Sequence, residues 1–387
     1  MFFDNAIHSY QDARRIAKRR LPWMVFDYID GTAGTGCGAR ASRAALDGIK
    51  LQPRVLNNVE DRSIAGQVFD RACKLPFGIA PMGMCNLASP SADRLLARMA
   101  AEDHIPVGVS TVASTSLEDM WEQSQGNAWF QLYISRSTGT AERLIARASA
   151  AGYKTLVLTV DVPEVGRRPR ELRRGFKMPF RIGPRQFVDF ACHPAWSLPQ
   201  LVKGKPEMGN FGGAFGEFDR EESRAGADWD TLARVRDQWS GKLVLKGVMD
   251  ARDAKRAQDA GVDAVQVSSH GSRQLDSAPP AIHALKNIRE ALGPEFPLFY
   301  DSGIQSGEDI VKAYAMGADF VFAGRVFSYA IAANGAGGLR QMRDVLAQEV
   351  SITLAQLGLR RMEEITPEVI APFCLITPNR GRRISHL

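Results

Sequence analysis

Short apolar runs alternate with amphipathic stretches along most of this 387-residue chain. Eight runs end in polar or glycine-containing turns, at residues 75–81, 107–111, 129–133, 155–161, 243–247, 264–269, 297–303 and 320–325. Such continuous runs are typical of parallel strands that are covered on both faces. Helix-like patterns lie between them, at 92–102, 141–151, 251–260, 282–292 and 308–316. Strands that alternate with helices in this way predict an α/β fold of the (β/α)8 TIM-barrel type.

The chain is longer than a bare barrel of about 250 residues. The surplus falls in an N-terminal extension (1–74), in an insertion after the fourth strand (162–228) and in a helical tail after Gly335. No Ser/Pro-rich linker interrupts the alternation of strands and helices. We therefore expect a single domain over 1–387 rather than two domains.

The net charge is +6, with basic clusters at 14–15, 18–20, 167–174 and 380–383. No nucleic-acid motif accompanies these clusters. An anionic substrate, an anionic cofactor or an anionic membrane surface would each account for the charge, and for the exposed clusters a solvated face is the default interpretation. The chain has no apolar run of 18 residues and no apolar signal-peptide core at its N-terminus. Its five cysteines show no metal-ligand spacing, so we expect a cytoplasmic protein without a metal site.

The ends of the predicted strands carry polar or reactive side chains. In order along the chain they are Met82, Ser110, Tyr133, Asp161, Lys246, His270, Asp301 and Arg325. In barrels of this type the active site lies at the carboxyl ends of the strands. We therefore expect these side chains to converge on one mouth.

The most informative of these ends is the stretch 268–276, in which His270 and Arg273 are three residues apart. An imidazole can accept a proton near neutral pH, and a guanidinium can hold a carboxylate bidentately beside it. This pair suits proton abstraction from a small organic acid; a surface loop with a chance His and Arg is the alternative. Asp161 can orient the imidazole of His270, or it can simply cap a loop.

Lys246 closes an apolar strand, where its charge can stabilise negative charge on a cofactor ring or reach solvent instead. Gln131 and Tyr133 can form hydrogen bonds to a heteroaromatic ring, although a buried, hydrogen-bonded tyrosine is an equally good interpretation.

The last two strand ends, 301–307 and 323–325, contain glycines and lead into helices. Loops at these two positions of a barrel commonly bind phosphate, and Arg325 adds a positive charge. A cofactor that carries a phosphate is therefore predicted. No Gly-x-Gly-x-x-Gly run opens a βαβ unit, which argues against a nicotinamide cofactor bound in that manner.

Several of these motifs occur together in one known family. They are Leu21-Pro22 with 26–28, 79–81, 130–133, 159–161 with 166–168, 245–247, 268–276, 301–303 and 324–325. Over about residues 8–365 the chain resembles the FMN-dependent L-2-hydroxy-acid oxidases and dehydrogenases, a family with glycolate oxidase, mandelate dehydrogenase and flavin L-lactate dehydrogenase as members. Through 110–112 and 193–196 it is most similar to the bacterial L-lactate dehydrogenases.

The resemblance implies FMN as the cofactor, His270 as the catalytic base and Asp161 as its partner. It also implies a group of side chains that bind the substrate, namely Tyr28, which is counted as catalytic too, Tyr133, Arg168 and Arg273. The residues expected to hold the flavin ring are Ser110, Gln131, Thr159 and Lys246. The residues expected at the ribityl phosphate are Asp301, Gly303, Gly324 and Arg325. Further cofactor-binding residues are Ala80, Pro81, Met82, Ser268, Ser302 and Gln305.

The chain departs from the family pattern at three places. Ser269 stands where the family usually has Asn, and Gln305 stands where it usually has Arg in the phosphate loop. The turn at 31–34 lacks the usual acid that follows it. Glutamine in place of arginine at position 305 removes one charge-assisted hydrogen bond from the phosphate site. Such a loss costs about 1.5–3 kcal/mol and predicts weakened FMN binding. The catalytic pair is nevertheless intact.

The leading hypothesis is FMN-dependent oxidation of an L-2-hydroxy acid, lactate-like or larger, to the 2-keto acid. The alternatives are an oxygen-using oxidase, a pathway-specific enzyme for a larger hydroxy acid, and a non-catalytic ligand-binding barrel. The resemblance places glycine at position 83 in dehydrogenases and alanine in many oxidases, so Gly83 favours a quinone or carrier over oxygen as acceptor. We also expect a homo-oligomer and no nucleic-acid partner.

The insertion is rich in aromatic, aliphatic and basic residues over 177–225. These are Phe180, Phe187, Phe190, Trp196, Leu198, Leu201, Phe211, Phe215 and Phe218, interleaved with Arg181, Arg185, Lys203 and Lys205. We interpret the segment first as a mobile lid over the active site. Docking on the inner face of an anionic membrane, as a peripheral protein, is the second interpretation. A loop packed on its own barrel or on a neighbouring subunit is the third.

Overall fold

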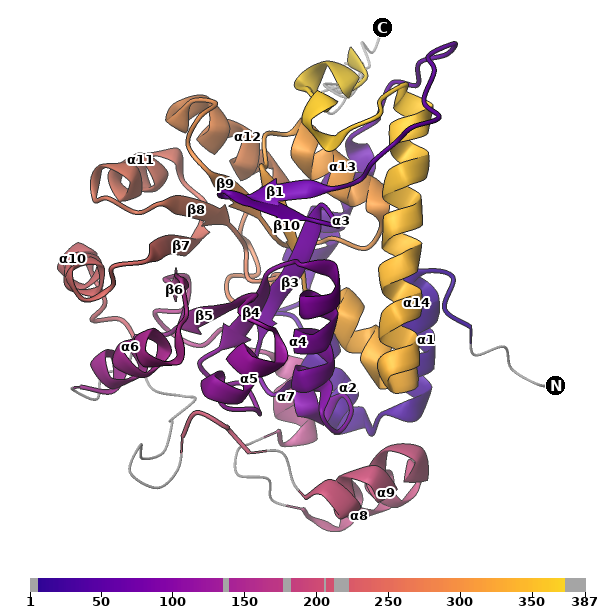
Figure 1. Cartoon of the computed structure of the whole chain (residues 1–387). Coiled ribbons are helices and arrows are strands. Elements are labelled where there is room, and N and C mark those ends of the chain that lie inside the picture. The colour runs from indigo at the N-terminus through magenta and orange to yellow at the C-terminus, as the bar shows by residue number, and fades with distance from the viewer. Residues whose placement is uncertain (1–5, 135–138, 177–181, 205–206, 212–222, 373–387) are drawn as a thin grey trace, which may run out of the picture.

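The computed structural model describes residues 6–134, 139–176, 182–204, 207–211 and 223–372, and within them the predicted barrel is present (Figure 1). Its eight parallel strands close in the order β10-β3-β4-β5-β6-β7-β8-β9. The strands are β3 (Phe77–Met82), β4 (Val107–Ser110), β5 (Ala128–Leu132), β6 (Thr155–Thr159), β7 (Lys242–Val248), β8 (Ala264–Val267), β9 (Leu298–Tyr300) and β10 (Phe320–Ala323). The expected (β/α)8 TIM-barrel fold is thereby confirmed.

Helices connect these strands on the outside of the barrel (Figure 1). The five expected from the sequence are α4 (Ala92–Asp103), α6 (Thr140–Ala151), α11 (Ala251–Asp259), α12 (Ala281–Leu292) and α13 (Gly307–Ala315). Two further ones are α5 (Leu117–Gln123) and α10 (Trp229–Gln238), of which α10 follows directly on the insertion 162–228. The helical tail expected after Gly335 is present, but its helix α14 (Arg325–Leu357) already begins at the end of β10. Gly335 has φ +53 and marks a kink inside α14 rather than its start.

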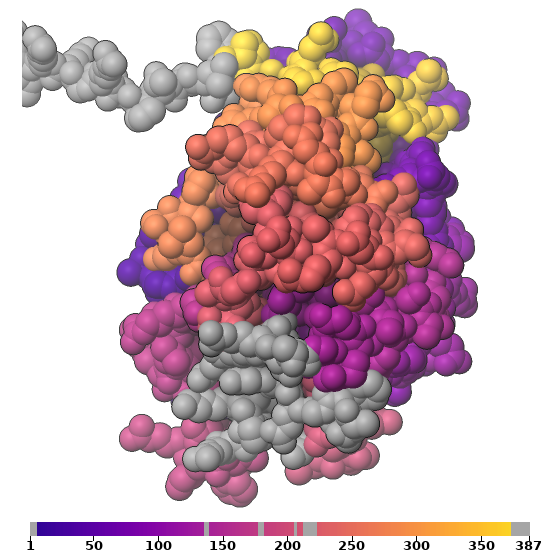
Figure 2. Space-filling view, turned by 90° about the vertical axis from the view of Figure 1, so that its left-hand side faces the viewer, coloured from indigo at the N-terminus to yellow at the C-terminus, as the bar shows by residue number. Residues whose placement is uncertain are grey.

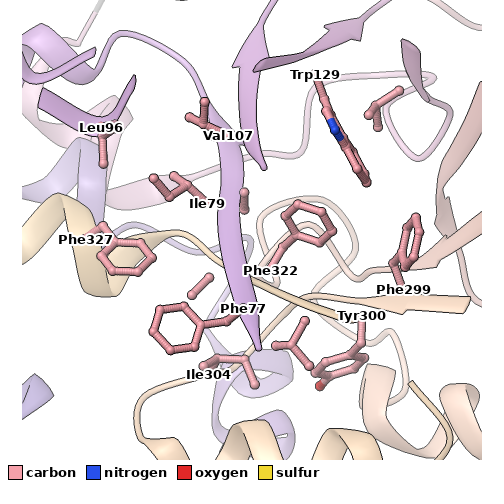
Figure 3. Close-up of a cluster of buried hydrophobic side chains, with 14 of the residues drawn as sticks. Phe77, Ile79, Leu96, Val107, Trp129, Phe299, Tyr300, Ile304, Phe322 and Phe327 are labelled. Atoms are coloured by element: carbon pink, nitrogen blue, oxygen red, sulfur yellow. The ribbon is translucent and has the colours of Figure 1, made fainter. Parts of the chain in front are cut away.

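Aromatic side chains fill the barrel (Figure 3). Trp129, Phe299 and Phe322 contact one another, with ring centroids 5.3–6.0 Å apart. A two-stranded hairpin, β1 (Gly66–Val68) and β2 (Arg71–Cys73), places Phe69 against Trp129 and Phe299. Phe69 thereby packs against this cluster. The packed interior leaves the carboxyl ends of the strands as the site for ligands.

The extension and the insertion add helices to the barrel. The extension supplies α1 (Tyr10–Arg20), which packs along α14, together with α2 (Trp23–Asp30) and α3 (Cys37–Gly48). The insertion supplies α7 (Pro169–Arg174), α8 (Pro184–Ala191) and α9 (Pro194–Lys203). Figure 1 shows α8 and α9 at the lower end of the molecule, below the barrel, and Figure 2 shows the pink surface of the insertion at the same end. None of the described helices combines the length and apolarity needed to cross a membrane.

Candidate active site

The strand ends surround a cavity of about 260 Å³ at the barrel mouth. Residues at or just after the carboxyl end of each of the eight strands line this cavity, as the sequence predicts. Ser110, Tyr133, Lys246, His270, Asp301 and Arg325 all line it. The wall also includes Tyr28 from α2 and Arg168 from the insertion, so both additions to the barrel reach the cavity. The convergence expected from the sequence is therefore found in the structure.

His270 lies just after β8 with its ring held on one side by a carboxylate. Its Nδ1 is 2.9 Å from Asp161 Oδ1, and its Nε2 is 3.3 Å from the Tyr133 hydroxyl. The backbone of His270 has φ +54, a conformation that is uncommon for residues other than glycine and that turns its ring out of the strand direction. A hydrogen on Nδ1 that is donated to Asp161 leaves Nε2 as the proton acceptor.

Neighbouring groups stabilise the negative charge of Asp161. Burial alone raises the pKa of this carboxyl, but the charge of His270 and the hydrogen bond to it, with Lys246 nearby, bring the pKa below its ordinary value. Asp161 is therefore ionised at neutral pH and can stabilise a positive charge on His270. Burial and the charge of Asp161 raise the pKa of Tyr133, so its hydroxyl remains a hydrogen-bond donor.

Two arginines lie beside the catalytic pair, of which Arg168 is buried and Arg273 is half-buried. Arg273 donates to the carbonyl oxygens of Tyr28 and Gly31, at 2.9 and 2.8 Å, and to Glu171 at 2.7 Å. Arg168 donates to the Arg273 carbonyl oxygen at 3.1 Å and lies 3.6 Å from Glu171. Burial, together with the like charge of Arg168, lowers the pKa of Arg273. Two neighbouring cations with one carboxylate between them can bind a further anion from the cavity.

Sequence reasoning missed Glu171, which is 4% exposed and links the two arginines. Its i,i+3 spacing from Arg168, at the start of α7, is the signal that could have identified it. The contact with Arg273 could not have been found, because it joins α7 to the loop after β8.

A second polar cluster lies at the ends of β7, β8 and β9. Lys246 Nζ is 2.8 Å from Ser268 Oγ and 3.0 Å from Asp301 Oδ2. Ser268 and Ser302 both donate to Asp301 Oδ1, at 2.6 and 2.9 Å. Gln266 donates to the other carboxylate oxygen at 2.7 Å. This carboxylate is thus saturated with donors, and it holds the Lys246 ammonium at the cavity wall.

The opposite side of the mouth, at β4, β5 and β6, has hydrogen-bonding capacity to spare. Gln131 Oε1 accepts from Ser110 at 3.1 Å, but within the described part of the chain Gln131 Nε2 has no partner. Thr159 Oγ1 is likewise buried without a partner among the described residues. Buried polar atoms without partners are costly, and here they face a cavity that a ligand can enter. A heteroaromatic ring with polar edges, such as a flavin, fits this wall.

The phosphate end of the predicted cofactor site is built from glycines and a helix start. Gly303 has φ +85, and Gly324 precedes the first turn of α14. Arg325 Nη2 donates to the carbonyl oxygens of Gly31 and Gly271, while its buried Nε has no partner among the described residues. The Gln305 backbone N–H donates to Asp309 at 2.9 Å. A helix N-terminus beside an arginine suits a phosphate.

The remaining sequence-predicted residues lie at the same mouth. Ala80, Pro81 and Met82, at the end of β3, line the cavity, as do Ser302 and Gln305. Gly83 follows them, and its carbonyl oxygen accepts from the Tyr28 hydroxyl at 3.2 Å. Ser268, which is fully buried, lies behind the wall and acts through Lys246 and Asp301.

The insertion is attached to the barrel by buried polar side chains. Asn210 is 1% exposed; its amide donates to the Ser110 and Thr111 carbonyl oxygens and accepts from the Leu117 N–H. Trp196 and Gln200 of α9 donate to the carbonyl oxygens of Leu87 and Asn86, both at 2.7 Å. These contacts agree with a segment packed on its own barrel at 196–200 and 208–211. Phe180, Arg181, Lys205, Phe215 and Phe218 lie outside the described residues.

Comparisons with known proteins identify the family of this chain. Residues 17–372 match the family described as FMN-dependent dehydrogenase. The chain is 35% identical over 374 residues to an L-lactate dehydrogenase of Pseudomonas syringae, which covers 94% of this chain and 98% of the relative. It is 36% identical over 375 residues to a putative L-lactate dehydrogenase of Mycobacterium tuberculosis, which covers 96% and 90% of the two chains.

Two solved structures are similar to this one over nearly the whole chain. The monotopic membrane protein (S)-mandelate dehydrogenase has a TM-score of 0.90 and 34% identity, and the match covers 94% of this chain and 99% of that one. A soluble mutant of the membrane-associated (S)-mandelate dehydrogenase from Pseudomonas putida has a TM-score of 0.81 and 32% identity over the same shares. The structure is thus more similar to the monotopic protein than to the soluble mutant.

Proposed function

This chain belongs to the FMN-dependent dehydrogenase family, with FMN as its cofactor, and we propose that it oxidises L-2-hydroxy acids to 2-keto acids. The observation that carries the proposal is the joint placement of His270, Arg168 and Arg273 around one cavity. An imidazole whose Nε2 faces the Tyr133 hydroxyl and can accept a proton lies beside two cations, which is the arrangement that a hydroxy acid with one carboxylate requires. The relatives and neighbours that act on lactate and mandelate support the same class of substrate.

In the proposed reaction the two arginines bind and orient the carboxylate of the substrate. The Tyr28 and Tyr133 hydroxyls lie at the cavity and are placed to bind the carboxylate and the hydroxyl group. His270 Nε2 accepts a proton from the bound hydroxy acid, and Asp161 stabilises the imidazolium that results. The substrate loses two electrons and two protons in all, and the product is the 2-keto acid.

FMN, when bound, supplies the acceptor for the two electrons. The residues proposed to hold its ring are Gln131 and Thr159, through their unpartnered polar atoms, with Ser110 and Lys246 beside them. Gly303, Gly324 and Arg325 are proposed to hold the phosphate. Lys246 is positively charged next to the ring site, so it can stabilise negative charge that develops there.

The proposed electron acceptor is a quinone or a carrier rather than oxygen, and Gly83 supports this choice. A Cβ atom at position 83 would lie 2.6 Å from Val112 Cγ2 and 3.7 Å from the Tyr28 hydroxyl. An alanine there would displace its neighbours at the cavity wall. Peroxide production in air as fast as turnover with artificial acceptors would overturn the choice.

We further propose that α8 and α9 attach the protein to an anionic membrane surface. Their outer faces carry exposed apolar side chains, namely Phe187, Val188, Leu198, Leu201 and Val202, with Ile182 just before α8. A basic rim adjoins them, formed by Arg14, Arg15, Lys18 and Arg19 of α1, which line one hollow with Trp23 and His193. An apolar face beside basic residues and an exposed tryptophan fits the headgroup region of a bilayer.

The greater similarity to the monotopic protein than to the soluble mutant supports this attachment. The free thiols of Cys37, Cys73, Cys85 and Cys192 fit the reducing, cytoplasmic side. Co-sedimentation with phosphatidylglycerol vesicles that falls as salt is raised would support it. Equal recovery with neutral and anionic vesicles, or none with either, would contradict it. A mobile lid and a homo-oligomer stay predictions.

The catalytic proposal is tested by mixing the purified flavoprotein anaerobically with a panel of L-2-hydroxy acids. We expect the yellow flavin absorbance to bleach with at least one member and a 2-keto acid to form in equal amount. Bound flavin that no member of the panel bleaches would overturn the proposal and would favour a ligand-binding barrel.

A further inference from the structure

The loop after β9 is held from outside the barrel by helix α3 of the N-terminal extension. Arg43 of α3 donates to both carboxylate oxygens of Asp309, at 2.7 and 2.8 Å. Asp309 lies in the first turn of α13 and is 1% exposed. A guanidinium that bonds twice to a carboxylate fixes its position and orientation, and it gives the buried charge a partner. The pair therefore connects the extension to the start of α13.

This ion pair reaches the backbone of the loop at two points. The Oδ2 atom of Asp309, which accepts from Arg43, also accepts from the Gln305 N–H at 2.9 Å. Arg43 Nη1 in addition donates to the Gly303 carbonyl oxygen at 3.3 Å. One guanidinium thus holds the peptide after Gly303 directly, and it holds the peptide before Gln305 through a carboxylate.

Close packing of α3 on the loop adds to these polar contacts. Gly303 has φ +85, and a Cβ atom there would lie 2.9 Å from Leu46 Cδ1 and 3.9 Å from Ser42 Cβ. The Lys312 ammonium of α13 donates to the carbonyl oxygen of Leu46, a fully buried residue, at 3.1 Å. Helix α3 therefore lies directly against the loop, with no room for a side chain at position 303.

The contact with Arg43 determines which way the Gly303 peptide faces. Gly303, Ile304 and Gln305 line the cavity at the barrel mouth, whereas Arg43 lies behind this wall. In a planar trans peptide the C=O group and the following N–H point in opposite directions. A Gly303 carbonyl that faces Arg43 therefore turns the Ile304 N–H away from Arg43 and toward the cavity. A backbone N–H in that position can donate to a phosphate oxygen.

We propose that Arg43 is a positioning residue for FMN, because through Asp309 and the Gly303 carbonyl it orients the backbone N–H groups that bind the phosphate of the cofactor. This inference rests on the proposed function, in which Gly303, Gly324 and Arg325 hold that phosphate. Arg43 does not bind the phosphate itself, since its guanidinium is occupied by Asp309, by Gly303 and by Asp47, whose Oδ1 is 2.8 Å from Nη2.

The proposal also bears on the glutamine at position 305. A loop that binds phosphate through backbone groups depends less on a charged side chain at that position. The support that Arg43 gives from behind the wall is therefore expected to matter more for FMN than for a flavin without a phosphate.

The test compares FMN with riboflavin, which has the same ring system and ribityl chain but no phosphate. The full-length protein is freed of bound flavin and titrated with each compound, and the change in flavin fluorescence gives both dissociation constants. The wild type should bind FMN more tightly than riboflavin. Arg43→Met should weaken FMN binding by roughly 10- to 100-fold, as for the loss of one charge-assisted hydrogen bond, and riboflavin binding by less than about threefold.

Arg43→Lys keeps the charge but loses the fork, so FMN binding should weaken by roughly three- to tenfold; this variant carries the test if Arg43→Met does not fold. Arg236→Met is the matched control. The Arg236 side chain is 24% exposed, against 26% for Arg43, and it likewise pairs with an aspartate, Asp263, and donates to a carbonyl oxygen, that of Gly241. Arg236 lies on α10, and its replacement should leave the ratio of the two dissociation constants unchanged.

The inference is overturned if the folded Arg43 variants bind FMN as tightly as the wild type does. It is also overturned if FMN and riboflavin binding weaken by the same factor, because Arg43 would then support the ring site or the fold as a whole. A wild type without a preference for FMN would overturn it too. In all these cases a holoenzyme whose flavin is bleached by a hydroxy acid leaves the proposed function standing. A holoenzyme that no hydroxy acid bleaches removes the proposed function, whereas the two dissociation constants still decide the role of Arg43.

Discussion

The barrel mouth and the hairpin formed by α8 and α9 differ in which side chains they bury and which they expose. At the mouth, charged groups are buried and meet partners, as in His270 with Asp161 and Lys246 with Asp301. On α8 and α9, apolar groups face outward, with Leu201 78% and Val202 84% exposed. The mouth is arranged in advance for a small anionic ligand, whereas the outer face of the hairpin formed by α8 and α9 exposes apolar side chains to solvent.

We therefore expect the barrel mouth to determine catalytic turnover and the outer face of the hairpin to determine membrane attachment. Many of the polar side chains at the mouth bond to one another, so single changes there should alter chemistry and leave attachment intact. The hairpin contacts the barrel through Trp196 and Gln200 on its inner face. Changes on its outer face should therefore alter attachment and leave chemistry intact.

The largest expected effect comes from the catalytic pair. His270→Ala removes the proton acceptor, so flavin reduction by an L-2-hydroxy acid should slow by at least about 100-fold while FMN remains bound. Asp161→Asn should slow it by less, because the imidazole keeps its place but loses its charged partner. Anaerobic stopped-flow absorbance measures both rates, and wild-type rates in His270→Ala would place the base elsewhere.

The next effect concerns the carboxylate clamp. Arg273→Lys keeps the charge but loses the fork that bonds to Tyr28, Gly31 and Glu171. Substrate affinity should fall by about 10- to 100-fold, because one charge-assisted hydrogen bond contributes about 1.5–3 kcal/mol. The saturation of the flavin reduction rate with substrate gives this affinity. Arg252→Lys, at a fully exposed helix start, is the control and should bind substrate as the wild type does.

A smaller and separate effect is expected at the hairpin. Replacement of Leu201 and Val202 by Asp removes two exposed apolar groups and adds negative charge facing an anionic surface. The fraction bound to phosphatidylglycerol vesicles should fall by at least about tenfold, since burial of one such side chain contributes about 1.5–3 kcal/mol. The rate of flavin reduction should remain within about twofold of the wild type.

Ile352→Asp provides the matched control, because Ile352 is also exposed, at 51%, but lies on α14. It should bind vesicles as the wild type does. Vesicle binding that survives the double replacement, or that is lost equally in the control, would remove the distinction between the two regions.

The smallest expected effect concerns the ion pairs that connect the N-terminal extension to the insertion. Asp30 on α2 accepts from Arg14 at 2.6 Å and from the Tyr329 hydroxyl at 2.6 Å, and it also pairs with Arg170 of α7. Burial raises the pKa of this carboxyl, but the bonds from Arg14, Tyr329 and Arg170 outweigh burial and bring it well below its ordinary value. Its stabilising contribution is therefore present above the unfolded pKa of about 3.9 and is lost as pH falls.

Asp30→Asn should lower the free energy of unfolding at pH 7 by about 1–2 kcal/mol, since both arginines are partly exposed. The variant should also lose less stability than the wild type between pH 5 and pH 3. Urea titrations at several pH values measure this. A parallel pH dependence in the two proteins would show that Asp30 is not the group responsible.

The barrel and its mouth could be predicted because their signals are local. A buried parallel strand is a continuous apolar run, and its end is the next polar residue, so Lys246 and His270 were placed correctly from sequence alone. The expected strands and the observed ones differ by a few residues at their ends. At β6, β8, β9 and β10 the final residues of the run leave the ladder, whereas β3 and β7 extend one residue past the expected end.

The remaining parts depend on contacts between distant segments. Glu171 lies in the insertion, and its importance follows from a contact with Arg273 that no local spacing reveals. The polar anchor Asn210 was missed for the same reason. The prediction that Gln305 weakens FMN binding also depends on contacts between distant segments. Only the fold shows that Arg325, whose Nε has no partner among the described residues, lines the same cavity as Gln305.

The central claim is that His270 and the two arginines hold one face of an L-2-hydroxy acid toward the flavin site. It is tested most directly by anaerobic reduction of the wild-type flavoprotein with the two enantiomers of one 2-hydroxy acid, at equal concentration. We predict bleaching by the L-enantiomer at least about 100-fold faster than by the D-enantiomer, since only one enantiomer can bind the arginines and present its proton to His270 Nε2. Equal rates for the two enantiomers would contradict the account.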